Sequence, residues 1–271
     1  MRCSLIGLFV NRVSKQALFT KQKLKMPSAV ILAGGLGTRL RSAYAAGPKS
    51  MAPVAGKPFL DYLLRWLSSE GVEEVILCVG YKRSHIQKHV GAGRKWGLRV
   101  KYSIEKELLG TGGALRQAIR LISGKRIVVV NGDTFLDISL SHLVQFHESR
   151  KARATVTAVE VLDNRRYGSL RLDVQGRITA FLEKAKGDED KKSGTTKKLI
   201  NGGVYVFERE LLKSIHSRVP VSLEKEVFPS LINRKNVFGY ATEAYFLDIG
   251  LPEDLKRAGR ELPARFHAHG K

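Results

Sequence analysis

The chain has 271 residues and a formal net charge of +22 at pH 7, with 47 Lys and Arg against 25 Asp and Glu. Its 43% hydrophobic content is enough for a folded core, which excludes global disorder, and no apolar run reaches the roughly 18–20 residues of a membrane helix. The basic charge suits nucleotides, sugar phosphates, nucleic acid or acidic membrane surfaces without choosing among them.

A basic extension precedes the first recognisable element of the chain. Residues 1–25 contain six Lys and Arg and no acid, and the apolar stretch Leu5–Val10 lacks the small-residue cleavage site of a signal peptide. Met26 stands directly before Pro27 and a strand pattern. We therefore expect residues 1–25 to be disordered or not native, and a single domain to occupy residues 26–271.

The two cysteines bear on the cellular compartment. Cys78 lies in an apolar strand pattern and Cys3 lies in the basic extension, so we expect no structural disulfide between them. Free thiols are typical of a reducing interior, which predicts a cytoplasmic protein.

The first half of the chain alternates between strand and helix patterns. Short apolar or alternating runs predict strands at Ser28–Ala33, Glu74–Val79, Arg99–Glu105 and Arg126–Asn131. Apolar residues at helical spacing predict helices at Pro58–Ser69, Ser84–Val90 and Gly113–Ile122. This alternation predicts an α/β fold with helices on both faces of a mixed, mainly parallel sheet, which is a three-layer α/β/α sandwich.

The pattern changes after about residue 150, where strands outnumber helices. Strands are predicted within Ala154–Val161, Gly168–Glu183, Gly202–Phe207 and Val237–Ile249. Helices are predicted at Arg209–Ile215, Leu223–Ile232 and Pro252–Leu262, and a charged loop at Lys184–Lys198. We see no internal repeat, so we expect the half formed by residues 151–271 to extend the sheet of residues 26–150.

A glycine-rich turn follows the first predicted strand and exposes backbone N–H groups that suit phosphate oxygens. Arg39 in this turn and Lys49 beyond it add positive charge. Two rival phosphate motifs do not fit, because a dinucleotide site needs glycine where Leu40 stands and Pro48 interrupts a P-loop. We expect nucleotide contacts from Leu32, Gly34, Gly35, Gly37 and Thr38.

Two aspartates follow predicted strands in positions that suit a metal ion. Asp133 comes just after Arg126–Asn131, at the carboxyl edge of the sheet, where ligands bind in such folds. Asp248 ends a late strand pattern and supplies a second carboxylate. Mg²⁺ in proteins is bound by one or two carboxylates together with substrate phosphates, so we expect Asp133 and Asp248 to hold Mg²⁺.

A third group of residues suits a nucleotide base. Gly110 and Thr111 belong to a run of small residues that opens a helix and lets a flat base approach the backbone. Glu105 lies just upstream, and its carboxylate suits the two adjacent donors of guanine better than the single imide N–H of uracil or thymine. The residues therefore favour guanine, with an exposed position for Glu105 at a strand end as the alternative.

These motifs together resemble the sugar-phosphate nucleotidyltransferase family. The resemblance covers roughly residues 28–258, and the motifs follow the family's order: Leu32–Leu40, Pro48-Lys49, Ala55–Pro58, Leu109–Ala114, Asn131–Asp133, Glu183-Lys184, Asn201–Gly203 and Phe246–Gly250. Within the family, Ser222–Pro229 and Tyr245–Asp254 resemble D-glycero-D-manno-heptose 1-phosphate guanylyltransferases.

The resemblance implies a Rossmann-like fold and transfer of a nucleoside monophosphate from a nucleoside triphosphate to a sugar 1-phosphate, with release of pyrophosphate. It implies Mg²⁺ as cofactor at Asp133 and Asp248. It also implies that Arg39 stabilises the departing pyrophosphate, Lys49 bridges phosphate groups and Lys184 orients the attacking phosphate. Sugar-phosphate contacts are expected from Gly168, Glu183, Lys184 and Asn201.

Two residues depart from the family pattern. Ala185 follows Glu183-Lys184, and Ser50 follows Lys49, where the family often has proline. Neither change removes a reacting group, although both alter the expected stiffness of their loops.

Several functions stay open at this point. The favoured one is transfer of GMP to a heptose 1-phosphate for bacterial surface polysaccharide biosynthesis. Another member of the family would use mannose 1-phosphate or N-acetylmuramic acid 1-phosphate, with GTP, UTP, dTTP or CTP. A catalytically silent regulator that binds sugar nucleotides is disfavoured by the joint presence of Arg39, Lys49, Asp133 and Asp248.

The partners expected from the sequence are the two substrates. The chain has no recognisable nucleic-acid-binding module, and phosphate ligands account for its positive charge, so we expect neither a nucleic acid nor a membrane partner. The sequence leaves open whether the chain forms a homo-oligomer.

Overall fold

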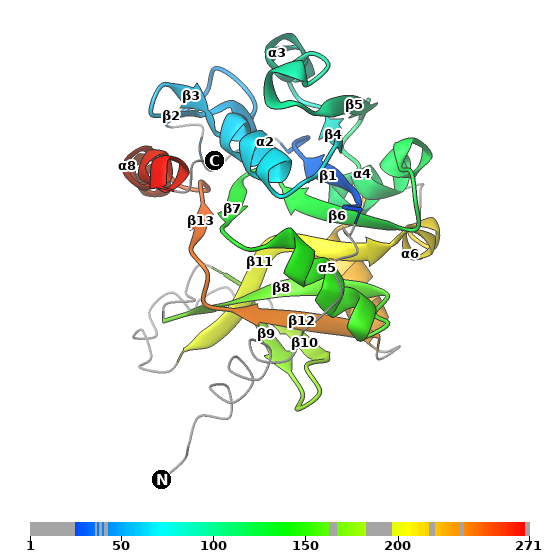
Figure 1. The fold of residues 1–271 in the computed structure, drawn as a ribbon. Coiled ribbons are helices and arrows are strands. Elements are labelled where there is room, and N and C mark those ends of the chain that lie inside the picture. Colours follow the sequence, from blue (N-terminus) through cyan, green and yellow to red (C-terminus); the bar gives the residue numbers. More distant parts are fainter. Residues whose placement is uncertain are drawn as a thin grey trace.

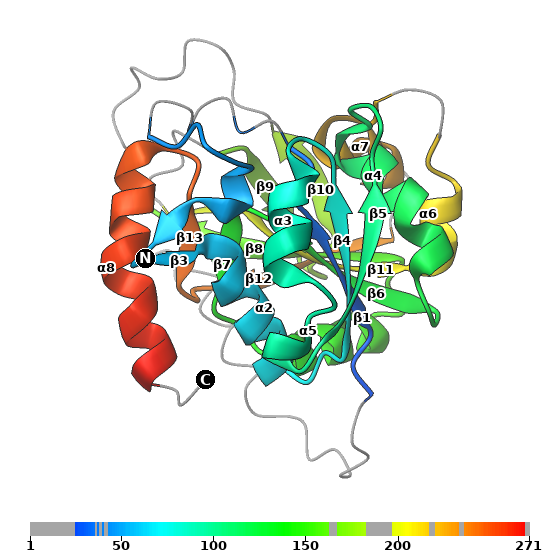
Figure 2. The same ribbon diagram turned by 90° about the horizontal axis from the view of Figure 1, so that it is seen from above.

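The computed structural model describes residues 25–35, 37, 40, 43–162, 167–182, 197–216, 220–232 and 236–268. For residues 267 and 268 it describes the backbone alone. Within these residues a large central sheet lies between two layers of helices (Figure 1). Viewed from above, α2 (Phe59–Ser69) and α3 (Arg83–Val90) lie on one side of the sheet, and α4 (Gly110–Ala118) and α6 (Arg209–Lys213) on the other (Figure 2). The predicted three-layer α/β sandwich is confirmed.

Four parallel strands form the first half of the sheet. They are β1 (Ser28–Leu32), β4 (Glu74–Val79), β5 (Arg99–Ile104) and β6 (Arg126–Asn131), each within a residue of its predicted bounds. β1 lies between β4 and β6, and β5 flanks β4. Because these strands run in one direction, β1 and β6 end at the same edge, where Leu32 pairs with Asn131.

The second half of the chain extends this sheet, as predicted. Its strands are β8 (Ala154–Val161), β9 (Ser169–Leu172), β10 (Ile178–Leu182), β11 (Lys198–Glu208) and β12 (Val237–Thr242). β11 joins the two halves, because its second part pairs antiparallel with β6 and its first part pairs with β9. The register of β11 against β8 shifts between Asn201 and Tyr205, where Gly203 has a φ of +70°.

The remaining elements are short, apart from one helix that closes the fold. The further α-helices are α5 (Leu140–Ser149), α7 (Phe228–Ile232) and α8 (Pro252–Ala268). The short elements η2 (Lys49–Met51), η3 (Arg94–Trp96) and η4 (Ile119–Leu121) are 3₁₀ helices, and η6 (Leu223–Val227) is a short π-helix. Two small sheets pair β2 (Pro53–Val54) with β3 (Lys57–Pro58), and β7 (Thr134–Leu136) with β13 (Phe246–Asp248).

Three segments differ from the sequence prediction. The helix expected over Leu223–Ile232 is a π-turn followed by α7, because Pro229 has no N–H to donate to an α-helical ladder. The strand-rich segment expected at Val237–Ile249 is divided between β12 in the central sheet and β13 beside β7. Helix α8 continues past its predicted end, and Phe266 in the added turn packs edge-on against Tyr62, with ring centroids 5.3 Å apart.

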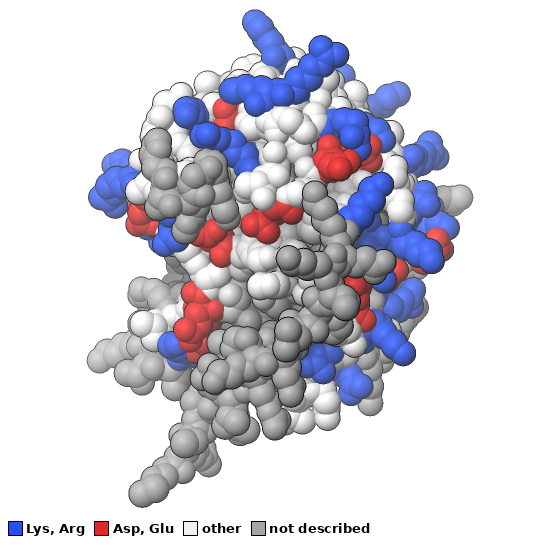
Figure 3. Space-filling model, viewed as in Figure 1, with Lys and Arg blue, Asp and Glu red and all other residues white. Residues whose placement is uncertain are grey.

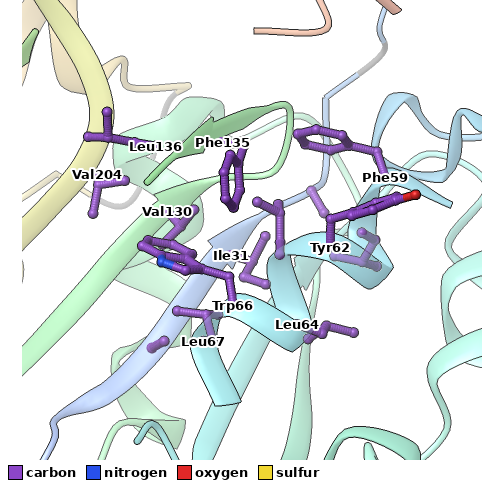
Figure 4. Packing of buried hydrophobic residues seen from close by; sticks show 14 of the residues in the cluster. Ile31, Phe59, Tyr62, Leu64, Trp66, Leu67, Val130, Phe135, Leu136 and Val204 are labelled. Atoms are coloured by element: carbon purple, nitrogen blue, oxygen red, sulfur yellow. The ribbon is translucent and has the colours of Figure 1, made fainter. Parts of the chain in front are cut away.

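Alternation along the strands builds a separate core on each face of the sheet. In β1, Ala29 and Ile31 face the core that includes α2, whereas Val30 faces the core that includes α4. On the first face, the fully buried Trp66 of α2 meets Phe135 edge-on, with ring centroids 5.9 Å apart (Figure 4). Because both faces are covered, the parallel strands β1, β4 and β6 are apolar between their ends, and their polar residues lie at the strand ends.

A buried histidine in this fold makes stability depend on pH. His147 of α5 is 1% exposed, and its Nδ1 lies 2.9 Å from Thr155 Oγ1 and its Nε2 3.3 Å from Glu208. Burial, followed by the charge of Arg126, lowers the pKa of His147 more than Glu208 raises it. Below pH about 6.5 the unfolded chain therefore takes up a proton that the folded protein resists.

We expect the unfolding free energy to fall as the pH drops through this value and the loss to level off below the folded-state pKa of His147. Urea unfolding at several pH values would measure it, and His147→Asn should flatten the dependence. His142→Asn is the control, since His142 is exposed on the same helix. Equal slopes for the parent and His147→Asn would contradict the assignment.

The basic charge is spread over the surface. Lys and Arg side chains lie around the margins of the face shown in Figure 3, including its upper edge over α3, and acidic groups lie between them. On and beside α3, Lys82, Arg83 and Lys88 are exposed. No helix in the described part of the chain is long and apolar enough to span a membrane.

Candidate active site

A pocket of about 340 Å³ lies at the carboxyl ends of β1 and β6, within the size range of small-molecule sites. Among the described residues it is lined by Leu32, Ala33, Gly34, Gly35, Gly37, Leu40, Lys49, Ser50, Glu105, Leu108, Gly110, Thr111, Ala114, Asn131, Gly132, Asp133 and Gly250. The three groups predicted from the sequence, namely the glycine-rich turn, the carboxylate after β6 and the start of α4, therefore share one cavity.

Lys49 connects the two aspartates at the bottom of this site. Its Nζ lies 2.6 Å from Asp133 Oδ2 and 3.4 Å from Asp248 Oδ1. Asp133 follows β6 and Asp248 ends β13, so the pairing of β13 with β7 brings together residues far apart in the sequence. The side chain of Lys49 is 12% exposed, so these charges interact in a partly desolvated setting and more strongly than in water.

The donor set fits a hard divalent cation. Two carboxylates converge on one positive charge, and Asp133 lines a pocket large enough for a phosphate-bearing ligand. The described residues contain no cluster of three or more His, Cys, Asp or Glu that could hold a metal alone. This pattern suits Mg²⁺, which uses one or two carboxylates and takes its other ligands from water and substrate phosphates. The metal role of Asp133 and Asp248 stays a prediction.

The glycine-rich turn packs against Glu105 in the pocket wall. A Cβ on Gly34 would lie 2.3 Å from Glu105 Oε1, so the absence of a side chain lets the turn lie directly on this carboxylate. At the other end of the turn, Gly37 has a φ of +59° and lies against the Lys49 side chain. Thr38 and Arg39, predicted for the same turn, lie outside the described residues.

Glu105 is buried in the pocket wall, so the alternative of an exposed strand end is wrong. The residue is 7% exposed, and its Oε2 accepts a hydrogen bond of 3.4 Å from the Leu109 N–H. Burial raises the pKa of Glu105, and the bond from Leu109 only partly offsets it. A carboxylate held in such a setting gains most from a ligand that brings two donors, because those donors stabilise its charged form.

The small residues that open α4 also have a packing role, in addition to the predicted approach of a base. Gly110 has a φ of +69°, and a Cβ there would lie 2.5 Å from the carbonyl oxygen of Val221. The N–H of Gly112 donates to that same oxygen at 2.8 Å. The glycines therefore allow α4 to approach the segment before η6, in addition to lining the pocket.

The hydroxyl of Thr111 is occupied within the protein. It accepts a hydrogen bond of 2.8 Å from the Leu223 N–H and lies 3.2 Å from Glu224 Oε2, to which it donates. We therefore expect the backbone of Thr111 to make any contact with a nucleotide. Its side chain links the start of α4 to η6.

The predicted sugar-phosphate residues either do not line this pocket or lie outside the described residues. Gly168 precedes β9 and Asn201 lies on β11, and neither lines the cavity described above. Asn201 Nδ2 donates to the Tyr205 hydroxyl at 2.8 Å, and its Oδ1 accepts from the Gly203 N–H at 3.0 Å. Glu183 and Lys184 fall outside the described residues.

Two polar residues of the pocket wall, Asn131 and Ser50, received no binding role in the sequence prediction. The Oδ1 of Asn131 and the Oγ of Ser50 are buried without a hydrogen-bond partner, and both residues line the pocket. Their places beside Asp133 and Lys49 in the sequence are a signal that could have led to them. Buried polar atoms without partners are uncommon in folded proteins, so their location in the pocket points to partners supplied by a ligand.

The chain belongs to the nucleotidyl transferase family, whose sequence model matches residues 28–265. It is 37% identical over 234 residues to the D-glycero-alpha-D-manno-heptose 1-phosphate guanylyltransferase of Aneurinibacillus thermoaerophilus, covering 86% of this chain and 97% of that protein. It is 39% identical over 236 residues to the mannose-1-phosphate guanylyltransferase of Mycobacterium tuberculosis, covering 86% of this chain and 64% of that longer protein.

A solved structure shares the fold over almost its entire length. The crystal structure of HddC from Yersinia pseudotuberculosis superposes with a TM-score of 0.77 at 33% identity, covering 87% of this chain and 99% of that one. The same protein complexed with GMP-PN superposes with a TM-score of 0.76. The family expected from the sequence motifs is confirmed.

Proposed function

We propose that the chain transfers GMP from GTP to D-glycero-α-D-manno-heptose 1-phosphate and releases pyrophosphate. The observation that carries this proposal is a single pocket that is lined both by the buried carboxylate of Glu105 and by the Lys49–Asp133 pair. A guanine base suits the first group, and phosphate groups suit the second. The similarity to guanylyltransferases supports the choice of nucleotide.

Mannose 1-phosphate is the second candidate for the sugar substrate. It is supported by the 39% identity to a mannose-1-phosphate guanylyltransferase, although this chain spans only 64% of that protein. The heptose relative is matched over 97% of its length, and this supports the heptose as the first choice.

The proposed chemistry needs no covalent intermediate on the protein. An oxygen of the sugar phosphate attacks the α-phosphorus of GTP and pyrophosphate leaves, so catalysis consists of positioning and charge neutralisation. Mg²⁺ supplies positive charge to phosphate oxygens when bound. Asp133 and Asp248 would hold the ion and Lys49 would contact the phosphates, while Arg39 and Lys184 would take the roles expected from the sequence motifs. We place this reaction in the cytoplasm, as a step of surface polysaccharide synthesis.

Pyrophosphate release from GTP and Mg²⁺ with separate sugar 1-phosphates tests this proposal. The panel contains the 1-phosphates of D-glycero-D-manno-heptose, mannose, glucose and N-acetylglucosamine. We expect the highest kcat/KM for the heptose. A higher value for mannose would change the sugar assignment, and no release with any member of the panel would contradict the proposed activity.

A further inference from the structure

A serine in the pocket wall has no partner inside the protein. Ser50 is 2% exposed and is the one residue of η2 that is fully buried, between Lys49 and Met51. Its Oγ is buried, and among the described residues it has no hydrogen-bond partner. Ser50 nevertheless lines the pocket, so its unpaired hydroxyl belongs to a residue that a bound ligand would contact.

The backbone around Ser50 is fixed. Pro48 precedes the turn, the Met51 N–H donates to the Pro48 carbonyl at 2.8 Å, and the Ala52 N–H donates to the Lys49 carbonyl at 3.0 Å. These bonds fix the backbone of Ser50, so on ligand binding only the rotation of its side chain remains to be ordered. Groups held in place in advance contribute more to binding because less conformational freedom is lost.

The neighbours of Ser50 identify the chemistry of its partner. Lys49 is adjacent in the sequence, and the Lys49 side chain touches Gly37 of the glycine-rich turn. A turn of this kind and an ammonium are both suited to phosphate. A serine hydroxyl donates one hydrogen bond, and phosphate oxygens only accept, so the two are complementary.

We propose that the Ser50 hydroxyl binds a phosphate oxygen of the substrate. The inference rests on the proposed function, which supplies two phosphate sources, the triphosphate of GTP and the phosphate of the sugar. A hydrogen bond from a buried hydroxyl to a charged oxygen contributes about tenfold in affinity. Without ligand, the same buried hydroxyl lacks a partner and lowers the stability of the protein.

Ser50→Ala therefore has effects of opposite sign on binding and on stability. The dissociation constant should rise about tenfold for the phosphate that Ser50 binds. The melting temperature of the ligand-free variant should stay unchanged or rise, because a methyl hydrogen needs no partner in a buried site. Calorimetry with a non-hydrolysable GTP analogue and, separately, with the sugar 1-phosphate distinguishes the two sources.

Ser103→Ala is the matched control. Ser103 is also buried, at 4% exposure, but its Oγ accepts a hydrogen bond of 3.1 Å from Gln117 Nε2, and the residue does not line the pocket. Its loss should lower the melting temperature and leave both dissociation constants as in the parent. The two buried serines thus have opposite expected outcomes.

The proposal is supported only if Ser50→Ala weakens at least one ligand more than about threefold with a melting temperature no lower than that of the parent. Unchanged dissociation constants, or weaker binding together with a lower melting temperature, would overturn it. If the parent protein binds neither ligand, the proposed function itself is contradicted. The failure of the Ser50 proposal and the failure of the proposed function are therefore distinguishable.

Discussion

Asp133→Asn is expected to lower turnover at least about 100-fold while leaving the fold intact. The variant loses the charge that pairs with Lys49 at 2.6 Å and that we assign to Mg²⁺. A bound metal stabilises developing charge by several kcal/mol, and about 2.7 kcal/mol corresponds to 100-fold in rate. The measurement is pyrophosphate release as a function of Mg²⁺ concentration.

Asp173→Asn is the control for this substitution. Asp173 caps the turn between β9 and β10, where its Oδ1 accepts from the Gln175 and Arg177 N–H groups at 2.9 and 2.8 Å. Asparagine retains such an acceptor oxygen, so its activity should match that of the parent. Turnover of Asp133→Asn within threefold of the parent would rule out the metal assignment.

Glu105→Gln is expected to reduce the preference for GTP over UTP and dTTP about tenfold or more. A buried, charge-assisted contact with two donors contributes about 1.5–3 kcal/mol, and about 1.4 kcal/mol corresponds to tenfold. Glutamine keeps one acceptor and gains a donor, so the use of a pyrimidine nucleotide should rise at the same time. The specificity constants for the three nucleotides measure this effect.

Glu107→Gln tests the same chemical change in the same loop. Glu107 is exposed, whereas Glu105 is 7% exposed, so the control should leave all three specificity constants as in the parent. If the ratios are also unmoved in Glu105→Gln, the base is recognised elsewhere, and the Gly110 end of α4 becomes the next candidate.

The sequence was sufficient for the fold class, for the positions of the parallel strands and for part of the pocket wall. The strand before Asp133 is apolar throughout because both faces of the sheet are covered, and this pattern places its end at the ligand-binding edge. The glycine-rich turn follows the adjacent strand, so its place beside Asp133 follows from parallel pairing.

The contacts between distant segments could not be predicted from local patterns. Lys49 meets Asp248 because β13 leaves the central sheet and pairs with β7, whereas the sequence predicted one strand-rich segment. The tight approach of Gly110 to Val221 depends in the same way on where η6 begins. The burial of Glu105 depends on Gly34 lying against it, a contact between separate strand ends.

The binding role of Ser50 could not be predicted for a different physical reason. A serine is common at the surface, and nothing in its local sequence shows that its hydroxyl is buried and unpaired. Only the three-dimensional structure shows which polar atoms lack a partner, and two such atoms belong to pocket residues.

Competition among nucleotides tests the account most directly. The protein is incubated with Mg²⁺, one sugar 1-phosphate and an equimolar mixture of GTP, UTP, dTTP and CTP, and the nucleoside diphosphate sugars are quantified by mass spectrometry. We predict that the GDP-sugar is the dominant product and that Glu105→Gln, but not Glu107→Gln, reduces its share. A UDP-, dTDP- or CDP-sugar as the dominant product of the parent protein would contradict the account.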